Sequence, residues 1–167
     1  MKAKLFLLLM ILCTYCHAQQ TDGEQIFEQK LAIGFKFFQE ENYDSAIIYL
    51  EQSFEIAQLI YTDNDKEMEH STRLLARTYY FLQQFEKAEE TWLLNLNVIK
   101  NSLGKDHSAY GIRLSNLAKL YSEMGEYNKA LPLALEALEN TKKSLGKDHY
   151  DYGIRLNNLA NLYRKMG

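Results

Sequence analysis

Cysteine and proline are almost absent from this chain of 167 residues, which has two cysteines and one proline. Both cysteines, Cys13 and Cys16, lie near the amino terminus, so the rest of the chain has no thiol for a disulfide framework or a thiolate metal site. The single proline and only eight glycines exclude collagen-like, proline-rich and flexible-linker classes. The formal net charge of −3 argues against a strongly basic nucleic-acid binder. With 47% apolar residues, the chain is expected to fold.

The amino terminus carries one short apolar run. Two lysines precede eight consecutive apolar residues, 5–12, and small residues close the segment. This order predicts a secretory signal peptide of residues 1–18, cleaved before Gln19. A transmembrane anchor is the alternative, but the run is too short for the roughly 30 Å apolar core of a bilayer. A lipoprotein anchor needs small residues directly before a cysteine, and neither cysteine has them.

Cleavage would change the composition of the mature chain. It removes both cysteines and two lysines, so that basic residues fall from 19 to 17 against 22 acidic ones and the net charge becomes −5. No other apolar run approaches membrane-spanning length. We therefore expect a periplasmic or extracellular protein without membrane insertion, stabilised by packing alone.

Internal repetition is the strongest signal in the sequence. Segments 103–125 and 145–167 are offset by 42 residues and identical at 17 of 23 positions. The same offset continues backwards with weaker identity, and it places small residues in register at Gly34, Ala76, Ala118 and Ala160. The chain is thus expected to hold three full repeats and half of a fourth.

Each repeat predicts two helices. In the third repeat, apolar residues recur with the spacing of one helical face, and Gly125 then supplies a turn that closes the first helix. Asn128 is expected to cap the second helix, with Pro132 tolerated in its first turn. One helix pair cannot bury its faces alone, so neighbouring pairs must stack. The expected inner faces are Leu114, Leu117, Ala118 and Tyr121 in the first helix, and Leu131, Ala134, Leu135 and Leu138 in the second.

The pattern Leu117-Ala118-x-x-Tyr121, followed by Gly125-x-Tyr127-x-x-Ala130, resembles the tetratricopeptide repeat. The 42-residue period, with LGKDH at 103–107 and 145–149, resembles the longer variety typified by kinesin light chains and common in exported bacterial proteins. The resemblance implies an all-α, right-handed α-solenoid of antiparallel helix pairs. The expected organisation is a signal peptide (1–18), a leader (19–26), repeats 27–68, 69–110 and 111–152, and the first helix of an incomplete repeat (153–167).

No catalytic spacing is present: the sequence has no Walker loop, dinucleotide glycine motif, HExxH or nucleophile elbow. His107 and His149 are repeat equivalents, and we interpret them as helix-start residues rather than as a metal or acid–base pair. Asp106 and Asp148 are expected to be helix N-caps. We therefore predict a protein that is not an enzyme and holds no cofactor or metal; the remaining histidine outside the signal peptide is His70.

Repeated cations and aromatic residues allow two further interpretations. Arg113 and Arg155 repeat, as do Lys105 and Lys147, and they could form an anion or nucleic-acid stripe. Because acidic residues are interleaved and the net charge is negative, a solvated face is favoured. The twelve tyrosines and Trp92 mostly occupy positions where a core is expected, although a stacking platform for bases or sugars is an alternative.

The resemblance also implies a binding surface, because the first helices of tetratricopeptide repeats line a concave groove. Asparagines equivalent to Asn116 and Asn158 bind peptide backbones in related families, and arginines could bind acidic side chains or a terminal carboxylate. We predict a protein or peptide partner on this face, with Ser115 and Ser122 beside the site. The predicted site residues are Arg73, Arg77, Tyr80, Asn116, Lys119, Asn157, Asn158, Asn161 and Arg164.

The last helix has no partner in this sequence. Leu156, Leu159, Ala160 and Tyr163 would present an apolar edge, whereas repeat arrays normally end in a polar cap. Two alternatives to a stand-alone scaffold follow. The repeats could be the sensing arm of a longer protein with a caspase-like peptidase or histidine kinase beyond residue 167, or the edge could drive self-association.

Overall fold

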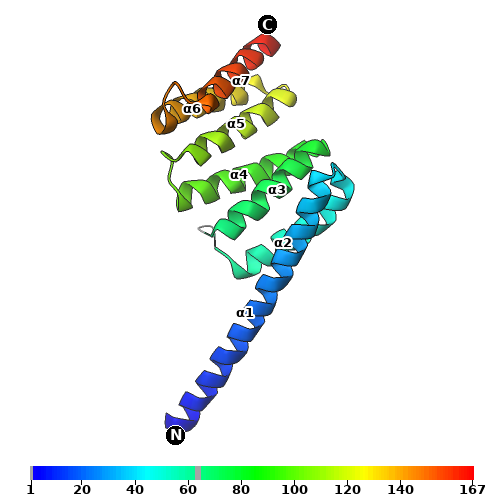
Figure 1. The fold of residues 1–167 in the computed structure, drawn as a ribbon, viewed down its shortest axis with the longest axis vertical. Coiled ribbons are helices and arrows are strands. Elements are labelled where there is room, and N and C mark those ends of the chain that lie inside the picture. Colours follow the sequence, from blue (N-terminus) through cyan, green and yellow to red (C-terminus); the bar gives the residue numbers. More distant parts are fainter. Residues whose placement is uncertain (1, 63–64) are drawn as a thin grey trace. The chain divides into compact units, whose positions relative to one another are not determined.

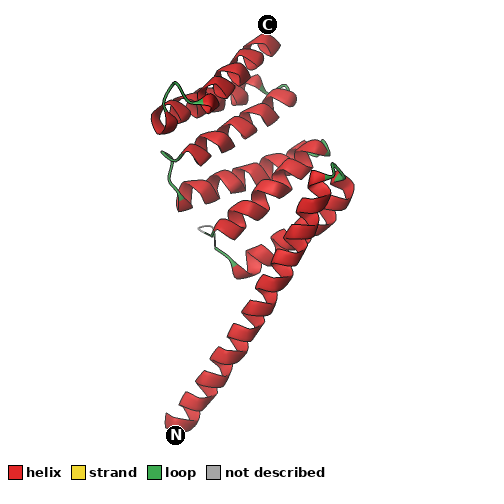
Figure 2. Cartoon of the chain, viewed as in Figure 1, coloured by secondary structure: helices red, strands yellow, loops and turns green. Residues whose placement is uncertain are grey.

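The computed structural model describes the backbone of residues 2–62 and 65–167 and the side chains of residues 20–62 and 65–167. Within these ranges the chain forms helices joined by loops and turns, with no strand (Figures 1 and 2). The predicted signal peptide lies outside the residues whose side chains are described, and it stays a prediction. The helices are α1 (Lys2–Gln39), α2 (Tyr43–Ile60), α3 (Lys66–Phe81), α4 (Phe85–Ser102), α5 (Ser108–Glu123), α6 (Tyr127–Leu145) and α7 (Tyr150–Met166).

The chain divides into two compact units, of which the first is Met1–Ile60. In this unit α2 packs along α1, and the two helices approach closely at Gly34. A Cβ atom on Gly34 would lie 2.7 Å from Leu50 Cδ2, so only glycine fits there without displacing Leu50. Phe27 and Ala46 are completely buried beside this contact. Gly34, one of the small residues that the repeat places in register, thus lies where the two helices approach each other most closely in this contact.

The second unit, Tyr61–Gly167, holds α3 to α7. Each helix packs against the next along the chain, and α5 also contacts α7 (Figure 1). Three-residue turns, 82–84 and 124–126, join the helices of a pair and reverse the chain direction. The second unit is therefore a row of helix pairs in which α3, α5 and α7 are the first helices.

The core of the second unit follows the predicted face in α5. Leu114, Leu117, Ala118 and Tyr121 are all buried there. The prediction for α6 is partly wrong, because Leu135 is 44% exposed and Ala137, at a neighbouring position, is buried instead. The face of α6 that packs inwards is made of small and polar residues rather than leucines. It consists of Ala130, Ala134, Ala137, Asn140 and Thr141.

The helix starts differ from those predicted by one or two residues. The N-caps of α5 and α7 are His107 and His149, and in each the Nδ1 atom accepts a hydrogen bond of 3.1 Å from the backbone N–H two residues on. The prediction that these histidines start helices is therefore confirmed. The prediction that Asp106 and Asp148 are the N-caps is wrong, because each helix begins one residue later than expected.

The turn before α6 also combines one correct and two wrong expectations. Gly125 has a φ of 75°, as a left-handed turn requires. The N-cap is Glu126, however, and not Asn128, which lies inside the helix. Because α6 starts at Tyr127, Pro132 stands in the second turn, where its missing N–H removes one helical hydrogen bond.

Over the described residues, no helix combines the length and apolar character that crossing a membrane requires.

Candidate functional site

Two pockets lie on the first helices of the second unit. The α3/α5 pocket has a volume of about 380 Å³ and an aromatic wall that includes Tyr80, Phe81 and Trp92. No carboxylate is among its lining residues, whereas four cations are. It is therefore suited to a ligand with both apolar and anionic groups. The cations are Arg73, Arg77, Arg113 and Lys119, and Ile112 and Asn116 complete the lining.

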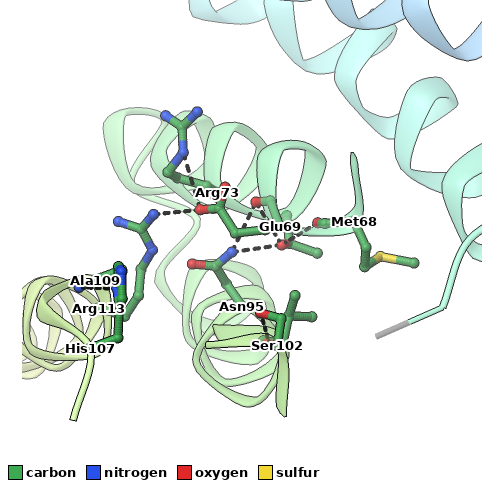
Figure 3. A network of polar contacts seen from close by, with 10 residues as sticks. Met68, Glu69, Arg73, Asn95, Ser102, His107, Ala109 and Arg113 are labelled. Carbon is green, nitrogen blue, oxygen red and sulfur yellow. Dashed lines mark hydrogen bonds and ion pairs between the residues drawn. The ribbon is translucent and has the colours of Figure 1, made fainter. Parts of the chain in front are cut away.

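Glu69 neutralises part of this positive charge from the first turn of α3. Its carboxylate forms an ion pair with the Arg113 guanidinium of α5, and Arg73 Nε lies 3.3 Å from the same oxygen (Figure 3). Asn95 of α4 holds this end of α3 by donating to the Glu69 backbone carbonyl at 3.0 Å and to Thr72 Oγ1 at 2.8 Å. The carboxylate thus joins neighbouring repeats through Arg113, while Arg73 binds it from within α3.

Burial and like charge together perturb Arg113. Desolvation lowers the pKa of its guanidinium, Glu69 opposes that effect, and the nearby cations Arg73 and Arg77 lower the pKa further. Arg113 is only 9% exposed, so its charge depends on the Glu69 carboxylate for compensation.

The α5/α7 pocket is the corresponding hollow one repeat further along and has a volume of about 250 Å³. Lys165 and Glu123 face each other across its rim at 2.9 Å. Asn158 Nδ2 donates to Ser115 Oγ at 3.1 Å, which orients the amide over the pocket. Lys119 lines both pockets, and its Nζ lies 5.1 Å from the centre of the Tyr80 ring. Lys119 therefore connects the two hollows into one surface.

We call the lining residues of these two pockets the first-helix face. Eight of the nine predicted site residues lie on it. Asn157 is the exception: it is exposed and lines neither pocket. Ser115 and Ser122 also lie on the face. The eight are Arg73, Arg77, Tyr80, Asn116, Lys119, Asn158, Asn161 and Arg164.

The expectation of a solvated face holds for the repeated lysines but is wrong for the repeated arginines. Lys105 and Lys147 are exposed, whereas Arg113 and Arg155 are 9% and 7% exposed. Each arginine precedes a buried leucine of its own helix by seven residues, Leu120 or Leu162, and so shares its buried face. That spacing was a usable signal in the sequence.

The aromatic residues divide between core and surface. Trp92, Tyr79, Tyr110 and Tyr121 are buried, as expected, whereas Tyr150 is 81% exposed. Tyr121 donates its hydroxyl to Glu89 at 2.6 Å, and burial together with this carboxylate raises its pKa. These tyrosines therefore serve packing more than they offer a stacking platform.

Metal-ligand geometry was searched among the residues the structure describes. No group of three or more histidine, cysteine, aspartate or glutamate side chains there is close enough to hold a metal ion. The half-buried His70 belongs to no such group.

Comparison with solved structures shows which proteins share this fold. A crystal structure of nearly identical kinesin light chain TPR-like repeats from Podosopora anserina is 21% identical, with a TM-score of 0.73 over 84% of this chain and 66% of that one. BtubC (BKLC) from P. vanneervenii is 17% identical, with a TM-score of 0.77 over 87% of this chain and 58% of that one. The chain thus spans less than two thirds of the length of either, and at these identities the likeness concerns the fold.

Comparison of the sequence with curated proteins gives no match. The sequence model of the tetratricopeptide repeat family, by contrast, matches residues 69–143 and 114–167, which together make up more than half of the chain. The all-α repeat fold and the resemblance to kinesin light chain repeats are therefore confirmed. The chain belongs to the tetratricopeptide repeat family.

Proposed function

We propose that this chain is an exported, non-catalytic scaffold that holds an extended peptide or a protein segment on its first-helix face. Tetratricopeptide repeats are a protein-interaction fold, and that much follows from the family. The observation that supports a site on this face is the convergence of predicted residues from three helices on two adjoining pockets.

The chemistry of the face suits a peptide backbone. The side-chain amide of Asn116 makes no hydrogen bond to any described residue, so it can both donate to and accept from a ligand. The side-chain amide of Asn158 donates one N–H to Ser115, and its side-chain carbonyl oxygen can accept a hydrogen bond from a ligand. Amides on successive first helices can therefore pair with an extended chain without reading its sequence.

The aromatic wall of the α3/α5 pocket would add affinity. Phe81 and Tyr80 offer apolar area at low entropic cost, and Lys119 over the Tyr80 ring adds a cation beside it. Each pocket would contribute modestly, and two joined pockets would give the ligand its orientation.

A peptide library displayed on phage and selected against the full chain tests the proposal. A selected peptide is then titrated against the double variant Asn116→Ala/Asn158→Ala by calorimetry. The expected result is a loss of affinity of about tenfold or more, because two amide pairs are removed. Asn97→Ala/Asn128→Ala is the matched control, since both of those asparagines are exposed and lie on second helices. Equal affinity of the two double variants would move the site off the first-helix face.

Export is proposed on the sequence alone. Sequencing the amino terminus of the protein recovered from outside the cytoplasm of its own cells should give Gln19. Recovery of an uncleaved chain beginning at Met1 would contradict export by a cleaved signal.

A further inference from the structure

Arg155 is a buried cation that forms no ion pair with any residue the structure describes. It lines the α5/α7 pocket and is only 7% exposed. Its Nε makes no hydrogen bond, and no ion pair reaches its guanidinium from the described part of the chain. Asp151, whose charge it senses, does not line the pocket and lies 3.8 Å from His149 Nδ1 instead. A guanidinium in such a position ordinarily has a carboxylate beside it.

The preceding repeat shows where that carboxylate would be. Arg113 occupies the same repeat position, 42 residues earlier, and it is paired with Glu69 of α3 (Figure 3). Adding one period to Glu69 gives Gly111. The two repeats thus share the arginine, but the position equivalent to Glu69 holds a glycine without a carboxylate.

A side chain at position 111 could not supply the missing carboxylate, because there is no room for it. A Cβ atom there would lie 2.2 Å from Asn140 Oδ1 and 2.9 Å from its Cγ. Asn140 is held in place because its Nδ2 donates to the Lys105 carbonyl at 2.6 Å. The packing of α6 against α5 therefore keeps position 111 bare.

The other charges of the pocket do not substitute for Glu69. Its one acidic lining residue, Glu123, is paired with Lys165. Arg164 at the exposed rim and Lys119 add two further positive charges. The pocket therefore presents unpaired positive charge above a buried guanidinium.

We propose that the α5/α7 pocket binds a carboxylate of the partner, which takes at Arg155 the place that Glu69 takes at Arg113. Arg155 supplies paired N–H donors, and Arg164 supplies charge at the entrance. The inference rests on the proposed function in one respect, namely that the carboxylate belongs to a peptide held on the first-helix face. The carboxylate chemistry of the pocket can be tested without that peptide.

The test uses the full chain with ¹⁵N-labelled arginine, in which each Nε–H gives its own NMR signal. Three small probes are titrated: N-acetylalanine, with a terminal carboxylate; N-acetylglutamic acid α-amide, with a side-chain carboxylate; and N-acetylalanine amide, with neither. The expected result is a saturable shift of the Arg155 signal at about 10 mM of one or both carboxylate probes. The stronger of the two identifies the source of the carboxylate.

The same spectrum contains its own control, because Arg113 already has Glu69. Its signal should move at least fivefold less than that of Arg155. No saturable shift of Arg155, an equal shift with the neutral amide, or an equal response of Arg113 would each overturn the proposal.

Two variants sharpen the test. Glu69→Gln should make Arg113 respond to the carboxylate probes as Arg155 does. Arg155→Gln should weaken the shift that the carboxylate probes cause in the Arg164 signal, since Arg164 lines the same pocket. Lys147→Gln removes an exposed charge from a neighbouring loop and should change neither. A failure of peptide binding with an intact Arg155 response would refute the proposed function alone, and the reverse pattern would refute only the carboxylate site.

Discussion

Removing the carboxylate of Glu69 gives the sharpest test of how the repeats are joined. Glu69→Ala deletes the partner of Arg113, which is 9% exposed and lies near two further arginines. A hydrogen bond to a charged group contributes about 1.5–3 kcal/mol, and the partly exposed i,i+4 pair with Arg73 adds about 0.3–0.5 kcal/mol. Because the Glu69 side chain is itself one fifth exposed, we expect a loss of about 2 kcal/mol in the free energy of unfolding.

Urea unfolding followed by tryptophan fluorescence measures this loss in the second compact unit, which contains Glu69. Trp92 is the only tryptophan, is buried, and lies in α4 of the second unit. With a slope of about 1.5 kcal/mol per molar urea, the midpoint should fall by slightly more than 1 M at an unchanged slope.

Glu139→Ala is the matched control. Glu139 also faces two cations, Lys142 at 3.3 Å and Lys143 at 3.8 Å, but its side chain is half exposed. Its removal should cost less than about 0.5 kcal/mol. A double-mutant cycle with Arg113→Met then isolates the buried contact, and the double variant should be more stable than Glu69→Ala alone. If Glu69→Ala unfolds at the same urea concentration as Glu139→Ala, the buried ion pair does not stabilise the repeat junction.

Three further outcomes follow from the structure. Gly111→Ala should cost about 1–3 kcal/mol because of the contact with Asn140, and adding Asn140→Ala should recover part of the loss; an unaffected urea midpoint for the single variant would contradict the close approach. His149→Ala should lower stability by about 1 kcal/mol and His149→Asn by much less, measured by thermal circular dichroism, with equal losses arguing against a cap. Since the pKa of Tyr121 is raised in the folded state, its hydroxyl stabilises the fold below the ordinary tyrosine pKa of ~10 and this contribution is lost as pH rises above it. Tyr121→Phe should therefore flatten the alkaline fall in stability, and an unchanged profile between pH 9 and 11 would refute that reading.

Much of the fold was predictable because the repeat period can be measured directly from identical residues in the sequence. The 42-residue offset fixed the helix pairs, and the 3.6-residue spacing placed Leu114 and Leu117 in the core. Helix ends were harder, since an aspartate next to a histidine gives two candidate caps and local sequence does not choose between them. In both loops the histidine is the cap, one residue beyond the predicted aspartate.

The candidate site was predictable only where it depends on position within one helix. Arg73 and Asn116 follow from the helical face, and the structure places both in the α3/α5 pocket. The compensation of the buried Arg113 charge depends on Glu69, which is 44 residues away on another repeat. The missing partner of Arg155 could be recognised only once the contact between Glu69 and Arg113 was known. The sequence alone does not indicate that position 111 would hold the partner of Arg155.

The near-identity of α5 and α7 has a consequence for how the chain finds its native pairing. Both helices contain the same five-residue segment, at 110–114 and 152–156, so α7 can compete for the place of α5 during folding. Only five residues, 103–107, separate α4 from α5, whereas α7 must close a far longer loop to reach the same place. The short connection therefore favours the native pairing, and lengthening it with a flexible insert before Lys105 should increase misregistered or domain-swapped species while the contacts of Lys105 and His107 with Asn140 are kept.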